Sequence, residues 1–416
     1  MDSAMTDRII RGCQAEVERY EQKMPPPHDF PMLRIPVSRY TDEEFFALEQ
    51  KHVFGRSWLH AGFASELPTA GSFKLCDHLR RPIVLVRDND GEIRAFYNVC
   101  RHRGAPLVNE PCGRNRMLVC QFHSWTYALN GELKHVPSGH EFPGVEKENI
   151  ALVPVRCERW GNMIFINEDP QASPLLESLG PLVKDFADKH MDTRKAFEIK
   201  TIELPCNWKI ALEGNVETYH LPRVHPNTVN TYIDHRGTFI QLYPRGHSAM
   251  YNILKAGKEA EEHNPLGFDG SNEQRINRET IPNFTIFPNM IASTAENEFV
   301  FITYWPIDQG RSRLDIIYTG PDGHDDPTAP AAQQLMAVID VTLDEDYSNT
   351  EWIQKSFASN VNAFLRAGFQ ERRVYHLHES IDRCIREVPE RYRVIPALES
   401  FETNPYATAI PGTNGQ

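Results

Sequence analysis

The segment from 207 to 226 carries side chains that can hold a metal ion. Glu217, His220 and His225 form the pattern E-x-x-H-x4-H. Proline interrupts a helix, so a helix is expected to end at Leu221-Pro222. A helix that ends there would direct both imidazoles at one point. Two neutral imidazoles and one carboxylate, with coordination positions left open, are the ligands that suit Fe(II) in oxygen activation. The pattern therefore predicts a mononuclear iron site whose third ligand comes from another part of the chain.

A second set of ligands lies upstream. Cys100 and His102 form C-x-H, and 17 residues separate them from Cys120 and His123, which form C-x-x-H. Two thiolates and two imidazoles in two short loops fit a Rieske [2Fe–2S] centre, while a Cys₂His₂ zinc site is the alternative. No cysteine in the second loop can pair with Cys112. We therefore expect a cluster without a bracing disulfide, with few hydrogen bonds to its sulfurs and a low potential for its class.

Composition limits the class of protein. A chain of 416 residues with 40% apolar residues suggests about two domains. The net charge of −13 argues against nucleic acid or an anionic membrane as a partner. The first residues lack a signal-peptide pattern and no apolar run is long enough to span a membrane, so we expect a cytoplasmic protein. The other six cysteines are scattered, as is typical of reduced thiols.

The elements that position these ligands fall into three predicted segments. Residues 1–40 form an N-terminal arm with several prolines. Residues 41–170 begin with a helix and continue as short strands with turns, which predicts an all-β domain around the cluster. Residues 171–416 combine long helices with strands that suggest a central antiparallel sheet, so the fold class is α+β. Each cysteine–histidine pair stands where a predicted strand gives way to a loop.

The third iron ligand is expected on a helix predicted from about 331 to 365. Asp346 shares a face of that helix with Ile353 and Phe357, and a carboxylate on an apolar face must be paired or bound. Asp346 is therefore our first choice for the ligand. Glu345 is the second choice.

Together these motifs resemble the catalytic α subunit of Rieske non-haem iron oxygenases, the ring-hydroxylating and demethylating group. N-W-K at 207–209, E-x-x-x-E-x-Y-H at 213–220, H-P at 225–226 and E-D at 345–346 carry the resemblance. The resemblance implies that four residues hold the cluster and three hold the iron: Cys100, His102, Cys120 and His123 for the first, and His220, His225 and Asp346 for the second. It further implies that Glu217 bridges the two centres across neighbouring subunits of a homotrimer.

The resemblance also implies the partners of the chain. O₂ would be the cosubstrate, and electrons from NAD(P)H would arrive through a separate reductase or ferredoxin. The chain itself has no glycine-rich dinucleotide fingerprint after a predicted strand. Two residues depart from the common pattern of the family: Gly214 stands where asparagine is usual, and Glu217 stands where many ring dioxygenases have aspartate. The second departure resembles the homo-oligomeric branch, whose members act on quaternary amines as well as aromatic acids.

We therefore expect a terminal oxygenase that hydroxylates an aromatic compound, an aromatic acid by our first interpretation. The alternatives are a monooxygenase that N- or O-demethylates a small substrate such as a quaternary amine, and an electron-transfer protein without oxygenase activity. A carboxylate would need an arginine clamp, and a quaternary ammonium would need an aromatic cage. The candidates are Arg223, Arg236 and Arg245 for the clamp, and Tyr232, Phe239, Tyr243, Tyr251 and Phe284 for the cage.

Overall fold

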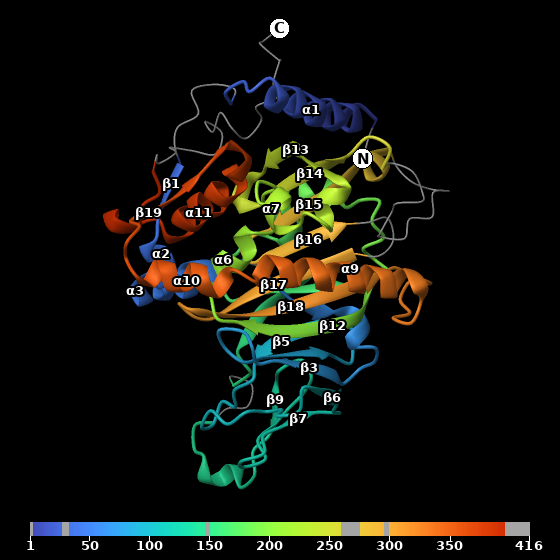
Figure 1. Ribbon diagram of the computed structural model, residues 1–416. Coiled ribbons are helices and arrows are strands. Elements are labelled where there is room, and N and C mark those ends of the chain that lie inside the picture. The colour runs from blue at the N-terminus through green and yellow to red at the C-terminus, as the bar shows by residue number, and fades with distance from the viewer. Residues whose placement is uncertain (1–2, 27–32, 146–149, 259–274, 295–298, 396–416) are drawn as a thin grey trace. The chain divides into compact units, whose positions relative to one another are not determined.

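The computed structural model describes residues 3–26, 33–145, 150–258, 275–294 and 299–395 (Figure 1). The chain forms two compact units, one of Phe54–Glu177 and one of Met1–Val53 with Ser178–Gln416. Residues 41–53, predicted to belong with the cluster domain, lie in the larger unit. Helix α3 (Glu43–Glu49) is held there by its last residue, because the buried carboxylate of Glu49 pairs with Lys209 of the larger unit at 2.9 Å. Among the residues described, no helix is long and apolar enough to cross a membrane.

The smaller unit is built from antiparallel strands, as predicted. Seven strands form one sheet in the order β2-β11-β10-β5-β4-β3-β6, and β7-β8-β9 form a second. The strands of the first are β2 (Leu59–Phe63), β3 (Ser72–Cys76), β4 (Ile83–Arg87), β5 (Ile93–Tyr97), β6 (Cys112–Arg114), β10 (Pro154–Trp160) and β11 (Met163–Asn167). Those of the second are β7 (Leu118–Val119), β8 (Thr126–Tyr127) and β9 (Leu133–His135).

Turn chemistry explains the two hairpins that lead to and from the ligand loops. Between β4 and β5, Asp88 Oδ1 accepts hydrogen bonds from the backbone N–H groups of Asp90 and Glu92, at 2.9 and 3.0 Å. Gly91 and Gly131, the latter between β8 and β9, adopt positive φ angles of 86° and 92°, which glycine tolerates best. Both hairpins confirm the turns expected from the sequence.

The larger unit contains a seven-stranded antiparallel sheet in the order β12-β18-β17-β16-β15-β14-β13, which confirms the predicted α+β class (Figure 1). Its strands are β12 (Lys195–Leu204), β13 (Ile233–Leu242), β14 (Ser248–Leu254), β15 (Thr280–Ile286), β16 (Met290–Thr294), β17 (Phe299–Asp308) and β18 (Arg311–Gly320). Helices α6 (Trp208–Glu213), α7 (Leu221–Val224) and α11 (Arg372–Ile385) also belong to this unit. In the predicted N-terminal arm, helix α1 (Ser3–Glu21) packs on β13, and β1 (Leu33–Pro36) pairs with β19 (Phe364–Ala367).

The long helix predicted from 331 to 365 is two helices in the structure. Helix α9 (Pro330–Tyr347) stops at Ser348, α10 (Thr350–Ala358) follows, and the chain then enters β19. The continuous helical face on which Asp346 was chosen therefore does not exist beyond α9. Asp346 nevertheless lies in the last turn of α9 with a side chain only 7% exposed, so the carboxylate still needs a partner.

Candidate metal centres

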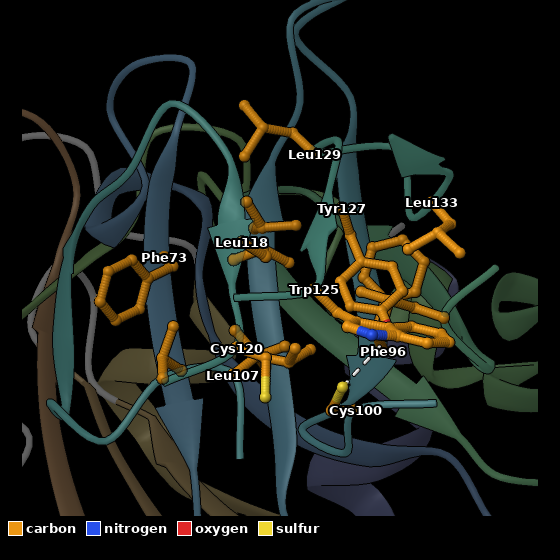
Figure 2. Close-up of a cluster of buried hydrophobic side chains, with 14 of the residues drawn as sticks. Phe73, Phe96, Cys100, Leu107, Leu118, Cys120, Trp125, Tyr127, Leu129 and Leu133 are labelled. Carbon is orange, nitrogen blue, oxygen red and sulfur yellow. Dashed lines mark hydrogen bonds between the residues drawn. The ribbon is translucent and has the colours of Figure 1, made fainter. Parts of the chain in front are cut away.

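Two backbone turns of the same design present the cysteines of the smaller unit. The N–H of Cys100 donates to the carbonyl of Ala105 at 2.8 Å, and that of Cys120 donates to Trp125 at 2.9 Å. The carbonyl of each cysteine accepts from a residue four positions on, Gly104 or Ser124. Both cysteines are 2% exposed and border a hydrophobic core that includes Trp125 (Figure 2). Each turn thus places a buried thiol at its start.

The histidines of the two loops lie side by side at the more exposed end of each turn. The rings of His102 and His123 have centroids 4.8 Å apart, and His102 stacks on Trp125 with an interplanar angle of 6°. Burial raises the pKa of the Cys100 thiol, so a thiolate here needs a bound cation to be stable. Two buried thiols beside two accessible imidazoles fit a Rieske cluster, in which thiolates hold one iron and imidazoles the other.

The spacing of these four side chains argues against a single zinc ion. A tetrahedral Zn²⁺ with Zn–S bonds of about 2.3 Å would draw all its ligand atoms to within roughly 4 Å of one another. Among the described residues, the one set of His, Cys, Asp or Glu ligand atoms gathered within 4.8 Å is His220, His225 and Asp346. The looser set around Cys100 and Cys120 fits two irons better than one ion.

Tyr127 lies beside a cluster ligand, which the sequence did not reveal. Its hydroxyl lies 3.4 Å from Cys100 Sγ and accepts the backbone N–H of Arg101 at 3.0 Å (Figure 2). Because the oxygen already accepts a hydrogen bond, its proton is available to donate to the sulfur. The cluster site therefore offers at least one side-chain hydrogen bond to a ligand sulfur. It contains no disulfide, since all eight cysteines are free.

The second centre is the group of His220, His225 and Asp346 in the larger unit. Asp346 Oδ1 lies 2.8 Å from His225 Nε2 and 3.4 Å from His220 Nε2. The two histidines flank α7, His220 at its N-cap and His225 at its C-cap, with Pro222 in the first turn. The helix expected to end at Pro222 instead begins there, because proline is tolerated in the first turn of a helix. One helical turn therefore sets the separation of the two imidazoles.

Carboxylates hold the other nitrogen of each imidazole. Glu217 Oε1 is hydrogen-bonded to His220 Nδ1, and Glu345 Oε2 is bonded to His225 Nδ1 at 2.7 Å. Glu345 also accepts the hydroxyl of Thr228 at 2.6 Å. The structure thus brings Asp346 to the Nε2 side of the group and leaves Glu345, the second choice, on the Nδ1 side. Such contacts fix the tautomer and direct Nε2 of each ring toward the place of a metal.

The electrostatics of the group favour a divalent cation. Burial lowers the pKa of His220, but hydrogen bonds with Asp346 and Glu217 raise it more, to about 10. Burial raises the pKa of Asp346, and its contacts with both histidines bring it below its ordinary value. Three carboxylates surround two imidazoles, so the donor set fits the iron that the sequence predicted.

A buried polar network supports the segment that carries these ligands. Glu213, at the end of α6, accepts the hydroxyl of Tyr40 at 2.8 Å and contacts His378 Nε2 at 2.7 Å. Arg39 Nη1 donates to His378 Nδ1 at 2.8 Å. Burial raises the pKa of Glu213 to about 8. Asn207 caps α6 through a 3.1 Å bond to the N–H at position 209, so the N-W-K motif fixes this short helix.

A cavity of about 120 Å³ lies beside the three ligands, lined also by α9 and by strands β14 to β17. None of the three candidate clamp arginines lines it, and Arg236 is paired with Asp234 at 2.6 Å. Of the candidate cage rings only Tyr232 lines it. Tyr251 packs against Phe239 and Phe284, with centroids 6.5 and 6.0 Å apart. Alternation along the strands turns these rings away from the cavity.

Two family models match parts of the chain. Residues 57–151 match the family model described as Rieske [2Fe-2S] domain, and residues 191–387 match the one described as ring hydroxylating alpha subunit (catalytic domain). The chain belongs to the Rieske non-haem iron oxygenase α subunits. The first range contains the two cysteine–histidine pairs, and the second contains His220, His225 and Asp346.

Named relatives cover part of the chain. The carnitine monooxygenase oxygenase subunit of Escherichia coli K12 is 34% identical over 195 residues, 46% of this chain and 52% of the relative. The biphenyl 2,3-dioxygenase α subunit of Rhodococcus jostii is 37% identical over 180 residues, 42% and 39% of the two chains. These matches span about half the length of the relatives or less. A crystal structure of a quaternary ammonium Rieske monooxygenase with an inhibitor has the same fold, with a TM-score of 0.72, 20% identity and coverage of 85% and 95%.

Proposed function

We propose that this chain is a terminal oxygenase component that uses O₂ and electrons from a separate reductase or ferredoxin to oxygenate a small organic substrate. The observation that supports it most directly is the position of His220, His225 and Asp346 on the wall of a cavity. A mononuclear Fe(II) held by two histidines and one carboxylate supplies O₂ activation when bound, because it keeps open coordination positions.

In this proposal each side chain has a separate task. His220 and His225 offer Nε2 atoms to the metal, and Asp346 offers Oδ1. Glu217 and Glu345 hold the Nδ1 atoms and so fix the orientation of both rings. The mainly apolar walls of the cavity would exclude water and hold a C–H bond of the substrate beside His220, His225 and Asp346.

Electron delivery is assigned to the Rieske cluster, held by Cys100, His102, Cys120 and His123. We propose a homotrimer in which Glu217 accepts a hydrogen bond from His220 of its own subunit and one from a cluster histidine of a neighbouring subunit. Glu217 lies two residues before Tyr219, whose side chain is 65% exposed, and this exposure supports contact with another subunit.

The substrate class is narrowed by the cavity and by the relatives. Hydroxylation of an aromatic acid loses support, because no arginine or lysine lines the described cavity wall. Monooxygenation of an alkyl carbon, with loss of the alkyl group where that carbon is bonded to nitrogen or oxygen, is better supported. The Escherichia coli relative is named as a carnitine monooxygenase, which supports the type of reaction and leaves the charge of the substrate open.

The experiment compares the wild-type protein with His225→Ala and with a matched control, His140→Ala, whose side chain is 79% exposed in the other unit. Iron and sulfide analysis, EPR of the reduced protein, and O₂ uptake with NADH and a surrogate reductase are measured. We expect His225→Ala to retain the cluster signal and lose substrate-dependent uptake and one iron, with no change in the control. Undiminished product formation by His225→Ala would disprove the iron site. A wild-type protein that transfers electrons but never oxygenates any substrate would favour the electron-transfer alternative.

A further inference from the structure

One face of the large sheet forms the floor of the cavity. Strands β14 to β17 each contribute two alternate residues to it, as expected for one side of a pleated sheet. A single row across these strands runs from Met250 to Asn283, then to Ser293 and Val300, since these residues pair in the sheet register. An amide and a hydroxyl therefore stand next to each other on a floor that is otherwise mainly apolar.

The direction in which the Asn283 amide points is fixed by a buried arginine. Arg373 Nη1 donates to Asn283 Oδ1 at 3.0 Å. A guanidinium has only donors, so the amide oxygen must face Arg373 and the NH₂ group must face away from it. No described residue accepts a hydrogen bond from Asn283 Nδ2 or is hydrogen-bonded to the Ser293 hydroxyl. By contrast, Asn252 on the same face is satisfied, since Nδ2 donates to the carbonyl of Ile281 at 3.2 Å.

Arg373 carries a positive charge behind this polar pair. Its side chain is buried, and its partners are the Ser248 hydroxyl at 2.9 Å, the Thr285 hydroxyl at 2.8 Å and the Asn283 amide. All three are neutral, and no carboxylate in the described part of the chain pairs with this guanidinium. The charge polarises the amide and makes its N–H groups stronger donors. A cation placed next to the Asn283 amide would be repelled by this charge, although the carboxylates of Glu217 and Asp346 also line the cavity.

The size of the cavity limits what enters it. A cavity of about 150 Å³ lined by apolar side chains admits benzene, so 120 Å³ beside the iron ligands suits a group of ring size. A second cavity of about 430 Å³ shares Val229, Tyr232, Val338 and Thr342 with the first. Its described lining consists of valine, alanine, threonine and tyrosine, without a charged side chain. A second, uncharged cavity therefore borders the one beside the three ligands.

We propose that the substrate is a neutral, mainly apolar molecule with a carbonyl or similar acceptor oxygen, and that Asn283, assisted by Ser293, is the residue that selects for it. The inference rests on the proposed oxygenase function and names its substrate class. It differs from a quaternary amine, for which Tyr232 alone offers a ring in the described lining, and from a carboxylate, for which no cationic side chain is present there.

Binding of four matched probes to the iron-loaded protein without O₂ tests the proposal. The probes are acetophenone, ethylbenzene, benzoate and phenyltrimethylammonium, and calorimetry gives each Kd. We expect acetophenone to bind about tenfold more tightly than ethylbenzene, the effect of one net hydrogen bond, and more tightly than both ions. In Asn283→Asp the guanidinium keeps its partner, but the group facing the cavity becomes an acceptor. We expect that variant to lose the preference for acetophenone and to bind phenyltrimethylammonium better, whereas the exposed control Asn360→Asp should behave as wild type.

Three outcomes would overturn the inference: tighter binding of phenyltrimethylammonium or benzoate than of acetophenone, an unchanged preference in Asn283→Asp, or no binding of acetophenone to protein that contains the iron and the cluster. The oxygenase proposal is judged separately, by O₂ uptake that depends on His225 with any substrate. Uptake with a quaternary amine, for example, would refute the substrate class and leave the oxygenase standing.

Discussion

Replacing Tyr127 with phenylalanine should lower the reduction potential of the Rieske cluster. The Tyr127 hydroxyl lies 3.4 Å from Cys100 Sγ, and a hydrogen bond to a charged group contributes about 1.5–3 kcal/mol. The bond is stronger when the cluster is reduced, because the electron adds negative charge to the sulfur. If about 1 kcal/mol of that energy depends on the redox state, the potential falls by about 40 mV, since a tenfold change in a one-electron equilibrium is about 59 mV.

The assay is a redox titration followed by EPR of the cluster. Tyr97→Phe is the matched control, because the Tyr97 hydroxyl donates to Glu168 at 2.8 Å in the same unit and forms no hydrogen bond with Cys100, His102, Cys120 or His123 in the described part of the chain. Loss of Tyr127 also frees the N–H of Arg101, so the EPR line shape must show that the loop is intact. A potential within about 10 mV of wild type, or a higher one, would refute the assignment of Tyr127 as a donor to the thiolate.

Other predictions concern the iron site and the stability of the larger unit. The pKa of metal-free His220 is raised to about 10, so iron must displace a proton from it at neutral pH. The affinity of the site for iron should therefore rise about tenfold per pH unit from pH 6 to 8, and an affinity independent of pH would contradict this. In a urea titration, Lys209→Met should lower the free energy of unfolding by about 3–5 kcal/mol, because it leaves a buried carboxylate unpaired. Lys355→Met removes one partner of an exposed ion pair and should lower it by less than about 1 kcal/mol. Gly214→Ala should stabilise by about 0.4–1 kcal/mol, since nothing lies within 4 Å of the added Cβ. Gly12→Ala should destabilise, because its Cβ would lie 2.3 Å from a phenylalanine ring; the opposite order of melting temperatures would refute this packing.

The sequence predicted best what depends on short spacing. The two cysteine–histidine pairs sit in turns of a few residues, and one turn of helix separates His220 from His225, so local pattern was enough to find them. Asp346 lies 121 residues from its partner His225, and it was chosen because an acid on an apolar face needs a partner. In the structure Asp346 is 7% exposed and lies against both histidines. The helical face used to support the choice was wrong, because α9 ends at Tyr347.

The cavity could not be predicted, because the direction of a side chain on a strand depends on register and on which face of the sheet is covered. Tyr251 and Met250 are neighbours in sequence, yet Met250 lines the cavity while Tyr251 packs in the aromatic core behind the sheet. Tyr127 escaped notice for a related reason. Its contact with Cys100 spans 27 residues and exists only because two separate turns fold against one core.

Asn283 and Ser293 show how far a sequence can point without giving the answer. Each interrupts a short apolar strand, T-I-P-N-F-T-I in β15 and M-I-A-S-T in β16, and a polar group in such a place costs free energy unless it is hydrogen-bonded. The sequence could therefore mark both residues as anomalous. Only the fold shows that Arg373, 90 residues away, satisfies the oxygen of the amide and leaves its N–H groups without a partner among the described residues. Half of the hydrogen bonding of Asn283 is thus supplied by the protein, and in our proposal the other half is supplied by the substrate.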